Sequence, residues 1–593
     1  MKKIIFNYTG NVYLNAGIAG IAVTLSSYEL WRKSMTPAPP PLDLEEDRDW
    51  GFADNSLWIT TDDPLRVLNH LYTVMGHRYY NTSTKDAIAK MTNFWYEPET
   101  DQFHPFPKMK TYGFGALLTN DAAGKTPNEA NTVRQKAIKA DDEFGQLLLR
   151  RNTEHFEERG LKLGQQLYVN EPYAKITRLK LTEADLAPGK KICPLTGEGF
   201  KRLQSADCVS PTTAGLTNFL PHLSRKGDKI GWKAMYAVRF APVLALYRYT
   251  GGLDTLYCYF YDHPDLETLY TIYQQVHNEI YLEQGAKQEA NHLNNINLAS
   301  LSLGGTNDAR LKGSDFVHPN EVLFQLIYTF GKALYDVSTN TTGLLKYAED
   351  EKNINLYLLR ANKFAGTMRP NTFTAFNHFA YVRRYIVAAE KEKIDWGQVL
   401  ASLRIHLPGK ERDWAKERLP REAVLKRLMV GQPFLEEMKA IYLGGYVLLL
   451  SGNTKDLGYK RWSQLTKLLK FNEFGPMNNH PQEEKAFREQ AYKLGTQIGM
   501  AIMDSGESGT SPRDVAKSGR KYIIDLDKSR TYEDFLEAIK RIQLRYERSV
   551  SKELFVQRMD DTNFRTAKLL ATIGALNVLN SNLSSKSKTP NND

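Results

Sequence analysis

Short motifs in this chain contain residue types that support catalysis in other proteins. Gly124-Lys125-Thr126 resembles the end of a phosphate-binding loop, but Thr119 stands where that loop needs its first glycine, so the backbone amides cannot wrap a phosphate. Residues 506–510 resemble a nucleophile elbow, but Gly509 falls one position early. The His-Asp dipeptide of one class of metal-dependent nucleases does not occur. We therefore expect no catalytic site and a protein that is not an enzyme.

The cysteines and histidines do not form a metal-binding pattern. Cys193-Pro194-Leu195-Thr196-Gly197 resembles half of a zinc knuckle in which threonine has replaced the second cysteine, and Cys208 and Cys258 do not restore a pair. A closed zinc site needs four nitrogen or sulfur ligands. His70 and His77 lie two turns apart on one face of an expected helix, without a carboxylate at ligand spacing. We expect neither a metal nor a cofactor, although three cysteines and a histidine would still suffice for a site.

Two polar stretches in the first half of the chain have the composition of nucleic-acid-binding loops. Amide side chains beside Gly304-Gly305 can read base edges in a groove, although a polar capping loop has the same composition. The candidate base-reading residues are Asn294, Asn295 and Asn297. A short basic turn at residues 224–229 is suited to phosphate contacts. Its candidate phosphate-binding residues are Arg225, Lys226 and Lys229.

Further basic residues cluster near the end of the chain. The candidate phosphate-binding residues there are Lys517, Arg520, Lys521, Arg541, Arg545 and Arg548. In a helix over residues 532–548 the three arginines share one face, and Leu536, Ile539, Ile542 and Leu544 supply apolar residues. Nearby carboxylates can neutralise part of this stripe, which leaves a salt-bridged surface helix as the alternative. Those carboxylates are Glu533, Glu537 and Glu547.

The positive charge is concentrated in the last third of the chain. The net charge of the 593 residues is +10, and residues 410–593 hold 32 lysines and arginines against 24 acidic residues. The first 409 residues are nearly balanced, with 46 basic and 44 acidic residues. An excess of positive charge attracts polyanions, and neutralised phosphates release counterions. The last third is therefore the expected nucleic-acid-binding surface.

The first half has the pattern of a mixed α and β region. Residues 2–8 and 168–181 are expected to form strands, and residues 17–33 have apolar residues at helical spacing. The prolines at 37–41 indicate an extended loop. Pro64, which follows residues able to cap a helix, marks the start of another helix.

After residue 316 apolar residues recur at helical spacing on charged segments, with prolines between them. The expected helices cover residues 321–337, 373–392, 421–429, 435–450, 483–503, 532–548 and 561–579. We predict an α+β fold: a mixed N-terminal α/β region followed by a C-terminal all-α helical bundle. The predicted domains are residues 1–315, a helical connecting region at 316–420 and the bundle at 421–593. A polar tail at 581–593 is expected to be disordered.

The composition also bears on the cellular compartment. Three cysteines in a chain of this size favour a reducing environment. The apolar start at residues 4–6 breaks at once on Asn7-Tyr8-Thr9-Gly10, where a signal peptide would continue. No window contains eighteen uninterrupted apolar residues. We expect a cytoplasmic protein that does not associate with a membrane.

Taken together, three features resemble the large subunit of type I CRISPR interference complexes (Cascade), closest to subtype I-B. The first is the opening Tyr8-Thr9-Gly10-Asn11-Val12-Tyr13-Leu14-Asn15-Ala16-Gly17, which resembles the N-terminal Thr-Gly turn of that family. The second is Cys193-Pro-Leu-Thr-Gly with Phe219-Leu-Pro-His222-Leu-Ser224-Arg225-Lys226 and Trp232, which resembles its cysteine-motif region. The third is the order of a mixed region and a helical bundle. Zinc-binding members carry paired Cys-x-x-Cys where this chain keeps one cysteine, so zinc is not implied.

The resemblance implies a non-catalytic subunit at the 5′-handle end of a guide RNA (crRNA), acting in antiviral defence. The mixed domain would contact the handle and recognise the protospacer-adjacent motif, and the chain would aid duplex opening and recruit the separate helicase–nuclease. The C-terminal bundle would resemble the small subunit and hold the displaced strand of the R-loop. Implied partners are crRNA, target double-stranded DNA, the displaced strand, and the backbone, handle-binding and small subunits. Met429, Met438 and Met477 are possible internal starts for a separate small subunit.

Two other functional classes remain open from the residues. A metal-dependent nuclease with dispersed carboxylates would cleave nucleic acid when purified. A protein scaffold would use its basic helices to bind an acidic partner and would be free of nucleic acid.

Overall fold

The computed structural model shows two compact units. The first comprises Met1–Leu301 with Phe330–Phe379, and the second comprises Ser302–Thr329 with Ala380–Asp593. The structure describes residues 1–33, 35, 38–79, 94–97, 101–105, 143–160, 181–205, 229–250, 255–283, 296–297, 302–303, 311–312, 315–338, 354–364, 367–405, 413–452, 457–475, 480–547 and 561–585.

The chain opens with a small antiparallel sheet in the first unit. Strand β1 (Lys2–Asn7) pairs with β3 (Ser56–Thr61), which pairs in turn with β2 (Trp50–Ala53). Ile4 and Phe6 of β1 are buried, and both are in register with β3. The strand predicted at residues 2–8 is confirmed.

Helix α1 (Val12–Lys33) is buried on nearly all sides along most of its length. It packs against α2 (Pro64–Tyr79), α8 (Trp232–Phe240), the 3₁₀ helix η4 (Ala241–Leu244) and α9 (Leu266–Glu283). Two glycines set the close crossing with α8 and η4. A Cβ on Gly17 would lie 1.9 Å from the carbonyl oxygen of Ala237, and one on Gly20 would lie 2.4 Å from that of Phe240. The helix predicted at residues 17–33 and the helix predicted to begin at Pro64 are both confirmed.

A five-stranded sheet completes the first unit. Its strand order is β12 (Ile296–Asn297), β10 (Leu246–Thr250), β11 (Thr255–Asp262), β15 (Asn355–Phe364) and β16 (Thr367–Phe376). The β12–β10 pair is parallel and the other pairs are antiparallel. Every residue of β11 is buried.

The prediction that residues 316–420 form a helical connecting region is wrong for β15 and β16, which are strands. The first residues of the helix predicted at 373–392 also lie in β16. Pro370 is one of the prolines that lie among the expected helices, but it lies within β16, in a pair that shifts register at Arg360/Ala361. Proline removes a ladder hydrogen bond, which an edge strand such as β16 tolerates. Cross-strand pairing with β11 and β15 therefore outweighed the local helical pattern.

Several shorter elements complete the described part of the first unit. They are β4 (Phe94–Glu97), β5 (Gln102–Pro105), α5 (Glu143–Glu157), α6 (Glu183–Leu186), β6 (Pro188–Ile192), β7 (Gly199–Phe200), β8 (Gln204–Ser205) and β9 (Lys229–Ile230). Strands β4 and β5, β6 and β7, and β8 and β9 form three two-stranded ribbons. The predicted strand at 168–181 lies outside the described residues, apart from its last residue.

The second unit is a helical bundle with one short ribbon, β13 (Ser302–Leu303) and β14 (Leu311–Lys312). Helix α10 (Pro319–Ser338) begins in this unit. The helices that follow are α12 (Phe379–Lys391), α13 (Trp396–Ser402), α14 (Trp414–Glu417), α15 (Leu419–Leu428), α16 (Leu435–Leu450), α17 (Tyr459–Phe474), α18 (Gln482–Asp504), α19 (Pro512–Lys528), α20 (Tyr532–Tyr546) and α21 (Asp561–Ser585).

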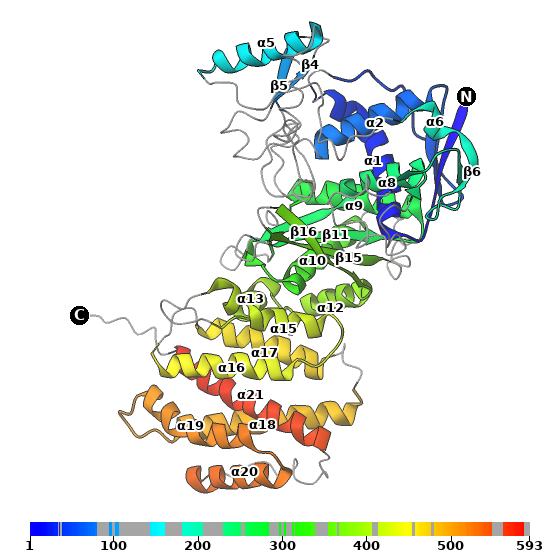
Figure 1. Cartoon of the computed structure of the whole chain (residues 1–593). Coiled ribbons are helices and arrows are strands. Elements are labelled where there is room, and N and C mark those ends of the chain that lie inside the picture. The colour runs from blue at the N-terminus through cyan, green and yellow to red at the C-terminus, as the bar shows by residue number, and fades with distance from the viewer. Residues whose placement is uncertain are drawn as a thin grey trace. The chain divides into compact units, whose positions relative to one another are not determined.

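Helix α21 forms the centre of the bundle and contacts α16, α17, α18, α19 and α20 (Figure 1). A Cβ on Gly495 of α18 would lie 1.9 Å from the carbonyl oxygen of Ala571, so the two backbones approach closely. The expectation that residues 581–593 form a disordered tail is wrong for its first five residues, which belong to α21. There the hydroxyl of Ser584 accepts a hydrogen bond from Nε1 of Trp462 at 3.0 Å and donates to the carbonyl of Leu457 at 2.6 Å.

The predicted fold class is confirmed: strands and helices precede a C-terminal run of helices. Within the ranges that the structure describes, no helix combines the length and apolar character needed to cross a lipid bilayer.

Candidate functional site

A cleft in the first unit is lined by segments that lie far apart in the sequence. The end of β1 and the start of α1 contribute one wall, the turn between β6 and β7 contributes a second, and the first turns of α8 contribute the floor. Its volume is about 200 Å³, and it is open to solvent. The lining residues are Phe6, Asn7, Tyr8, Thr9, Leu14, Ile18, Leu195, Thr196, Glu198, Lys233, Ala234 and Ala237. We call this the α1–α8 cleft.

The Thr9-Gly10 turn is held in place by side chains of α1. The amide and the hydroxyl of Thr9 both donate to Oδ1 of Asn15 at 3.1 Å. Asn11 caps the helix, because its Oδ1 accepts from the amides of Tyr13 and Leu14 at 3.1 Å. Gly10 has a φ of +66°, a conformation that glycine adopts without strain. The polar residues of this motif therefore position the first wall of the cleft.

The Cys193-Pro-Leu-Thr-Gly segment is a closed backbone turn. The amide of Cys193 donates to the carbonyl of Glu198 at 2.8 Å, and the amide of Gly197 donates to the carbonyl of Cys193 at 2.9 Å. Gly197 has a φ of +70°. Cys193 is a free, buried thiol, while Leu195, Thr196 and Glu198 face the cleft. This turn thus presents the second wall.

Neither Cys193 nor the other candidate ligands form a metal site in the part of the chain that the structure describes. Cys258 is buried in β11, where burial raises the pKa of its thiol, and Cys208 lies outside the described residues. Burial, followed by the charge of Arg66, lowers the pKa of His70.

An ion pair crosses the cleft. Nζ of Lys233 lies 2.7 Å from Oε2 of Glu198, and Nδ2 of Asn7 donates to Oε1 of Glu198 at 3.4 Å. The side chains of Lys233 and Glu198 are 17% and 26% exposed, so both charges are partly removed from water. Sequence reasoning missed this pair. The sequence did offer one indication of these two residues: Glu198 directly follows the Cys193-Pro-Leu-Thr-Gly motif, and Lys233 directly follows Trp232.

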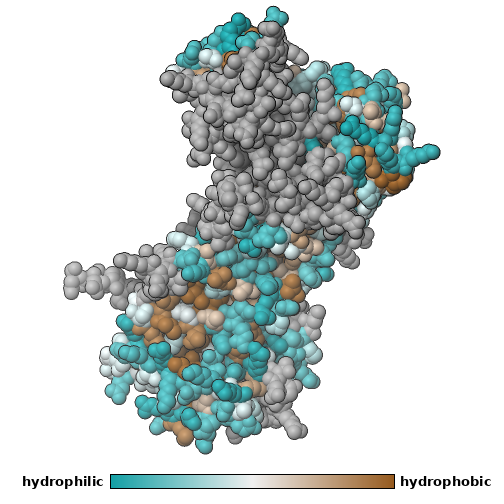
Figure 2. Space-filling view, viewed as in Figure 1, coloured by the Kyte–Doolittle hydropathy of each residue, from teal (hydrophilic) through white to brown (hydrophobic). Residues whose placement is uncertain are grey.

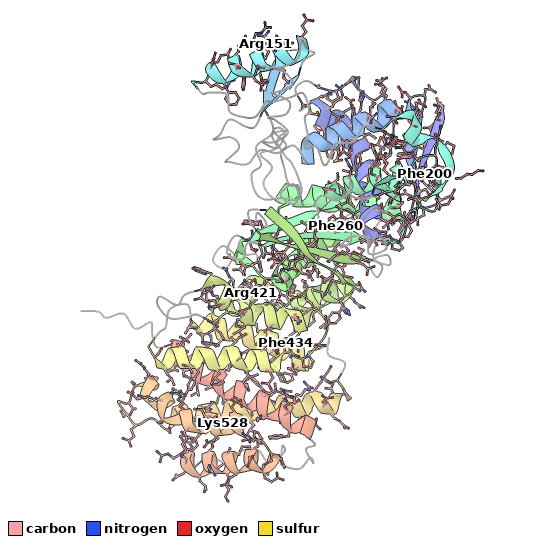
Figure 3. All side chains as sticks on the ribbon, in the orientation of Figure 1. Arg151, Phe200, Phe260, Arg421, Phe434 and Lys528 are labelled. Carbon is pink, nitrogen blue, oxygen red and sulfur yellow. The ribbon has the colours of Figure 1, made fainter. Side chains whose placement is uncertain are left out.

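The start of α8 is fixed by aromatic packing. Phe200 of β7, labelled in Figure 3, lies against Gly231, where a Cβ would be 2.2 Å from Cε2 of its ring. Trp232 and Tyr236 pack edge-on and stacked, respectively, against Phe6 at centroid distances of 5.9 and 6.1 Å. These contacts hold Lys233 at the cleft.

A buried carboxylate lies behind the Thr9-Gly10 turn. Nδ2 of Asn15 lies 3.5 Å from Oδ1 of Asp262, and burial raises the pKa of Asp262 to about 6. Burial, together with this carboxylate, also raises the pKa of Tyr8. The turn thus links the cleft to an ionisable group in β11.

Exposed basic residues, which sequence reasoning missed as well, lie on or next to β1, β6 and β7. A second hollow shares Glu198 and Lys233 with the cleft and is lined also by residues of β1, β6 and β7. We call six of these residues the basic rim: Lys2 and Lys3, which line the second hollow, and Lys190, Lys191, Lys201 and Arg202, which lie on or next to β6 and β7. Among the described residues, none of the six has a carboxylate within ion-pair distance. The rim is therefore suited to phosphate groups.

In the bundle, five predicted phosphate-binding residues are exposed on two adjoining helices. Lys517, Arg520 and Lys521 lie on α19, and Arg541 and Arg545 lie on α20. Hydrophilic side chains predominate over these helices on the face seen in Figure 2. We call these five residues the α19–α20 surface.

Acidic neighbours distinguish Arg541 from the other residues of this surface. Arg541 lies 3.5 Å from Glu537 and 4.0 Å from Asp525, so the predicted neutralisation of the stripe applies to it. Lys517, Arg520 and Lys521 have no such neighbour within the ranges described. Ile539 and Ile542 are buried as expected, but Leu544 is 72% exposed and does not belong to the core. Helix α20 ends at Tyr546, and Arg548 lies outside the described residues.

The remaining predicted residues are not brought together in the described structure. Lys229 is exposed in β9, which pairs with β8, so it belongs to a strand and not to the predicted turn. The backbone of Asn297 pairs with Tyr247 in the five-stranded sheet. Asn294, Asn295, Arg225 and Lys226 lie outside the described residues.

Helix α17, which was not among the expected helices, carries a third group of exposed basic residues. Lys460, Lys467 and Lys470 share one face, opposite buried Trp462 and Leu469. The spacing of the buried residues was the signal that could have found this helix.

The two sites offer different chemistry. The α1–α8 cleft places a hydrogen-bond donor and an acceptor side by side against apolar walls, which suits a planar polar ligand. The α19–α20 surface offers cationic donors to phosphates. No protein-family model and no curated protein matches this sequence.

Proposed function

We propose that this chain is the non-catalytic large subunit of a type I CRISPR interference complex, closest to subtype I-B, which acts in RNA-guided DNA targeting. One observation carries this proposal. The two motifs that resemble the family, the Thr9-Gly10 turn and the Cys193-Pro-Leu-Thr-Gly turn, lie far apart in sequence but line one cleft. Asn7 and Glu198, 191 positions apart, are hydrogen-bonded there. A shared location supports a shared role for motifs that individually carry little information.

The two units would divide the work of target recognition. The first unit would contact crRNA and recognise the protospacer-adjacent motif, with Asn294, Asn295 and Asn297 at base edges and Arg225, Lys226 and Lys229 at phosphates. The α19–α20 surface would hold the displaced strand through charge, without reading its sequence. The subunit would act in the cytoplasm with the other Cascade subunits and would recruit the helicase–nuclease.

The proposal is tested by purifying the tagged full chain from cells that also express the neighbouring genes and a crRNA. We expect a guide-length RNA and repeated backbone subunits to co-purify. The isolated chain should bind DNA with an affinity that falls steeply with salt, without cleaving it. Divalent-metal-dependent cleavage abolished by one carboxylate substitution would instead indicate a nuclease. Co-purification of an acidic protein without nucleic acid would indicate a scaffold.

A further inference from the structure

The α1–α8 cleft combines three features that bear on the identity of its ligand. Apolar side chains of α1 and α8, including Leu14, Ile18 and Ala237, form walls that favour an uncharged flat group over a solvated one. The Glu198–Lys233 pair supplies a carboxylate and an ammonium group side by side. Lys2 and Lys3 of the basic rim, which line the neighbouring hollow, supply exposed cations beyond the walls. A ligand that matches all three has a planar polar head and an anionic chain.

A nucleobase on its phosphodiester backbone has this composition. Single-stranded nucleic acids can expose individual bases, which proteins bind in pockets through their Watson–Crick edges. Lys2 and Lys3 line the hollow that shares Glu198 and Lys233 with the cleft, so they are available to backbone phosphates that continue outside the cleft. A free uncharged metabolite would make no use of the rim.

The ion pair further selects among the four bases. Guanine presents two adjacent N–H donors, N1–H and N2–H, beside the acceptor O6. The two oxygens of the Glu198 carboxylate match the donors, and the ammonium group of Lys233 matches O6. Among the described residues, Oε1 of Glu198 is engaged only by the 3.4 Å hydrogen bond from Asn7, which a base can replace. Uracil, adenine and cytosine each lack the paired donors.

We propose that the α1–α8 cleft binds a guanine base turned out of a single-stranded nucleic acid, with Glu198 and Lys233 as the residues that select it. The inference rests on the proposed function, because it assigns a ligand to a protein taken to handle single strands. Guanine could belong to RNA or to DNA, since both present the same base edge.

The test measures binding of the full chain to labelled oligouridine strands that carry one central guanine, adenine, cytosine, inosine or abasic residue, with a matching oligothymidine series in DNA. A single guanine should tighten binding about tenfold, and inosine, which lacks the N2 amino group, should lose most of that gain. The variants are Glu198→Gln and Lys233→Met. Glu267→Gln, an exposed carboxylate of α9, serves as the matched control. Melting temperatures confirm that each variant is folded.

The outcomes separate this inference from the proposed function. Loss of the guanine preference in Glu198→Gln and Lys233→Met, with its retention in Glu267→Gln, supports the inference, and the series that shows the preference identifies RNA or DNA. Equal binding of all strands, preference for another base, or an unchanged preference in both cleft variants overturns it while the proposed function stands. Failure to bind any strand, with no RNA co-purifying, overturns both.

Discussion

Asp262 shows how one buried residue makes the stability of the fold depend on pH. Asp262 is the last residue of β11, and its side chain lies behind the Thr9-Gly10 turn. Burial raises the pKa of this carboxyl from 3.8 to about 6. The folded chain therefore holds this proton more tightly than the unfolded chain does. The resulting stabilisation is complete below about pH 4 and is lost as the pH rises through about 6.

We predict that Asp262→Asn stabilises the protein at pH 8 but not at pH 4. The substitution removes the cost of burying a charged carboxylate, about 3 kcal/mol for a pKa shift of this size, and keeps an oxygen for the hydrogen bond from Asn15. Melting temperatures of variant and wild type at the two pH values provide the measurement. Asp43→Asn, at an exposed position, should change little at either pH. A similar gain at both pH values would show that the charge of Asp262 is not the cause.

Gly17 illustrates a second effect at the residue scale, the close approach of two backbones. We predict that Gly17→Ala destabilises the protein by about 1–3 kcal/mol or more, because the new methyl group would overlap the carbonyl oxygen of Ala237. Gly458→Ala is the matched control, since a Cβ there would meet no atom within 4 Å. The free energy of unfolding, measured by denaturant titration, distinguishes the two. An unaffected Gly17→Ala variant would show that α1 and α8 do not cross as described.

At the scale of elements, a buried ion pair joins two helices of the bundle. Nε of Arg421 on α15 lies 2.7 Å from Oε1 of Glu321 on α10, and the two side chains are 1% and 0% exposed. The same guanidinium donates to the carbonyls of Leu400 and Asp315 at 3.2 and 2.6 Å. Oε2 of Glu321 accepts from the amides of Val317 and His318 at 2.8 and 3.1 Å. The arginine, labelled in Figure 3, thus ties together several segments of the second unit.

We predict that Arg421→Met lowers the free energy of unfolding by about 3–5 kcal/mol, because it leaves the carboxylate of Glu321 buried without its counter-ion. The double variant Arg421→Met/Glu321→Gln should recover part of that loss. Arg427→Met removes an arginine of the same helix whose pair with Glu437 is more exposed, and it should cost less than about 1 kcal/mol. Equal losses in the two single variants would contradict the assigned difference in burial.

At the scale of the whole molecule, exposed positive charge is spread over surfaces of both units. The basic rim lies in the first unit, and the α19–α20 surface and the lysines of α17 lie in the second. The net charge of +10 therefore does not arise from one patch. Each surface should contribute to the affinity for single-stranded nucleic acid in proportion to the number of its lysines and arginines that have no acidic neighbour.

We predict that Lys517→Glu/Arg520→Glu/Lys521→Glu weakens binding to single-stranded DNA of every sequence and reduces the slope of log affinity against log salt by about 2, as expected for three lost phosphate contacts. Arg541→Glu should change the slope less, because Glu537 and Asp525 already lie beside this arginine. Binding measured at several salt concentrations tests both statements. An unchanged slope in the triple variant would exclude α19 from the interface.

Local signals predicted much of the molecule. Apolar periodicity, proline positions and capping residues identified α1, α2 and most bundle helices, and α16 was predicted with the observed bounds. The prediction failed where distant partners determine the conformation. Residues 355–364 and 367–376 pair as strands because β11 offers a buried strand to the first of them, and residues 581–585 remain helical because Trp462 and Leu457 bind Ser584.

The sequence by itself determined the fold class, the net excess of basic residues in the last third and the two motifs, because helix periodicity, composition and turn chemistry depend on neighbouring residues. The tertiary structure alone decided that these motifs line one cleft. That cleft exists because Gly17 and Gly20 let α1 approach α8 closely and because Phe200 fixes the start of α8. Asn7, Glu198 and Lys233 meet there only through these long-range contacts, which no local pattern encodes.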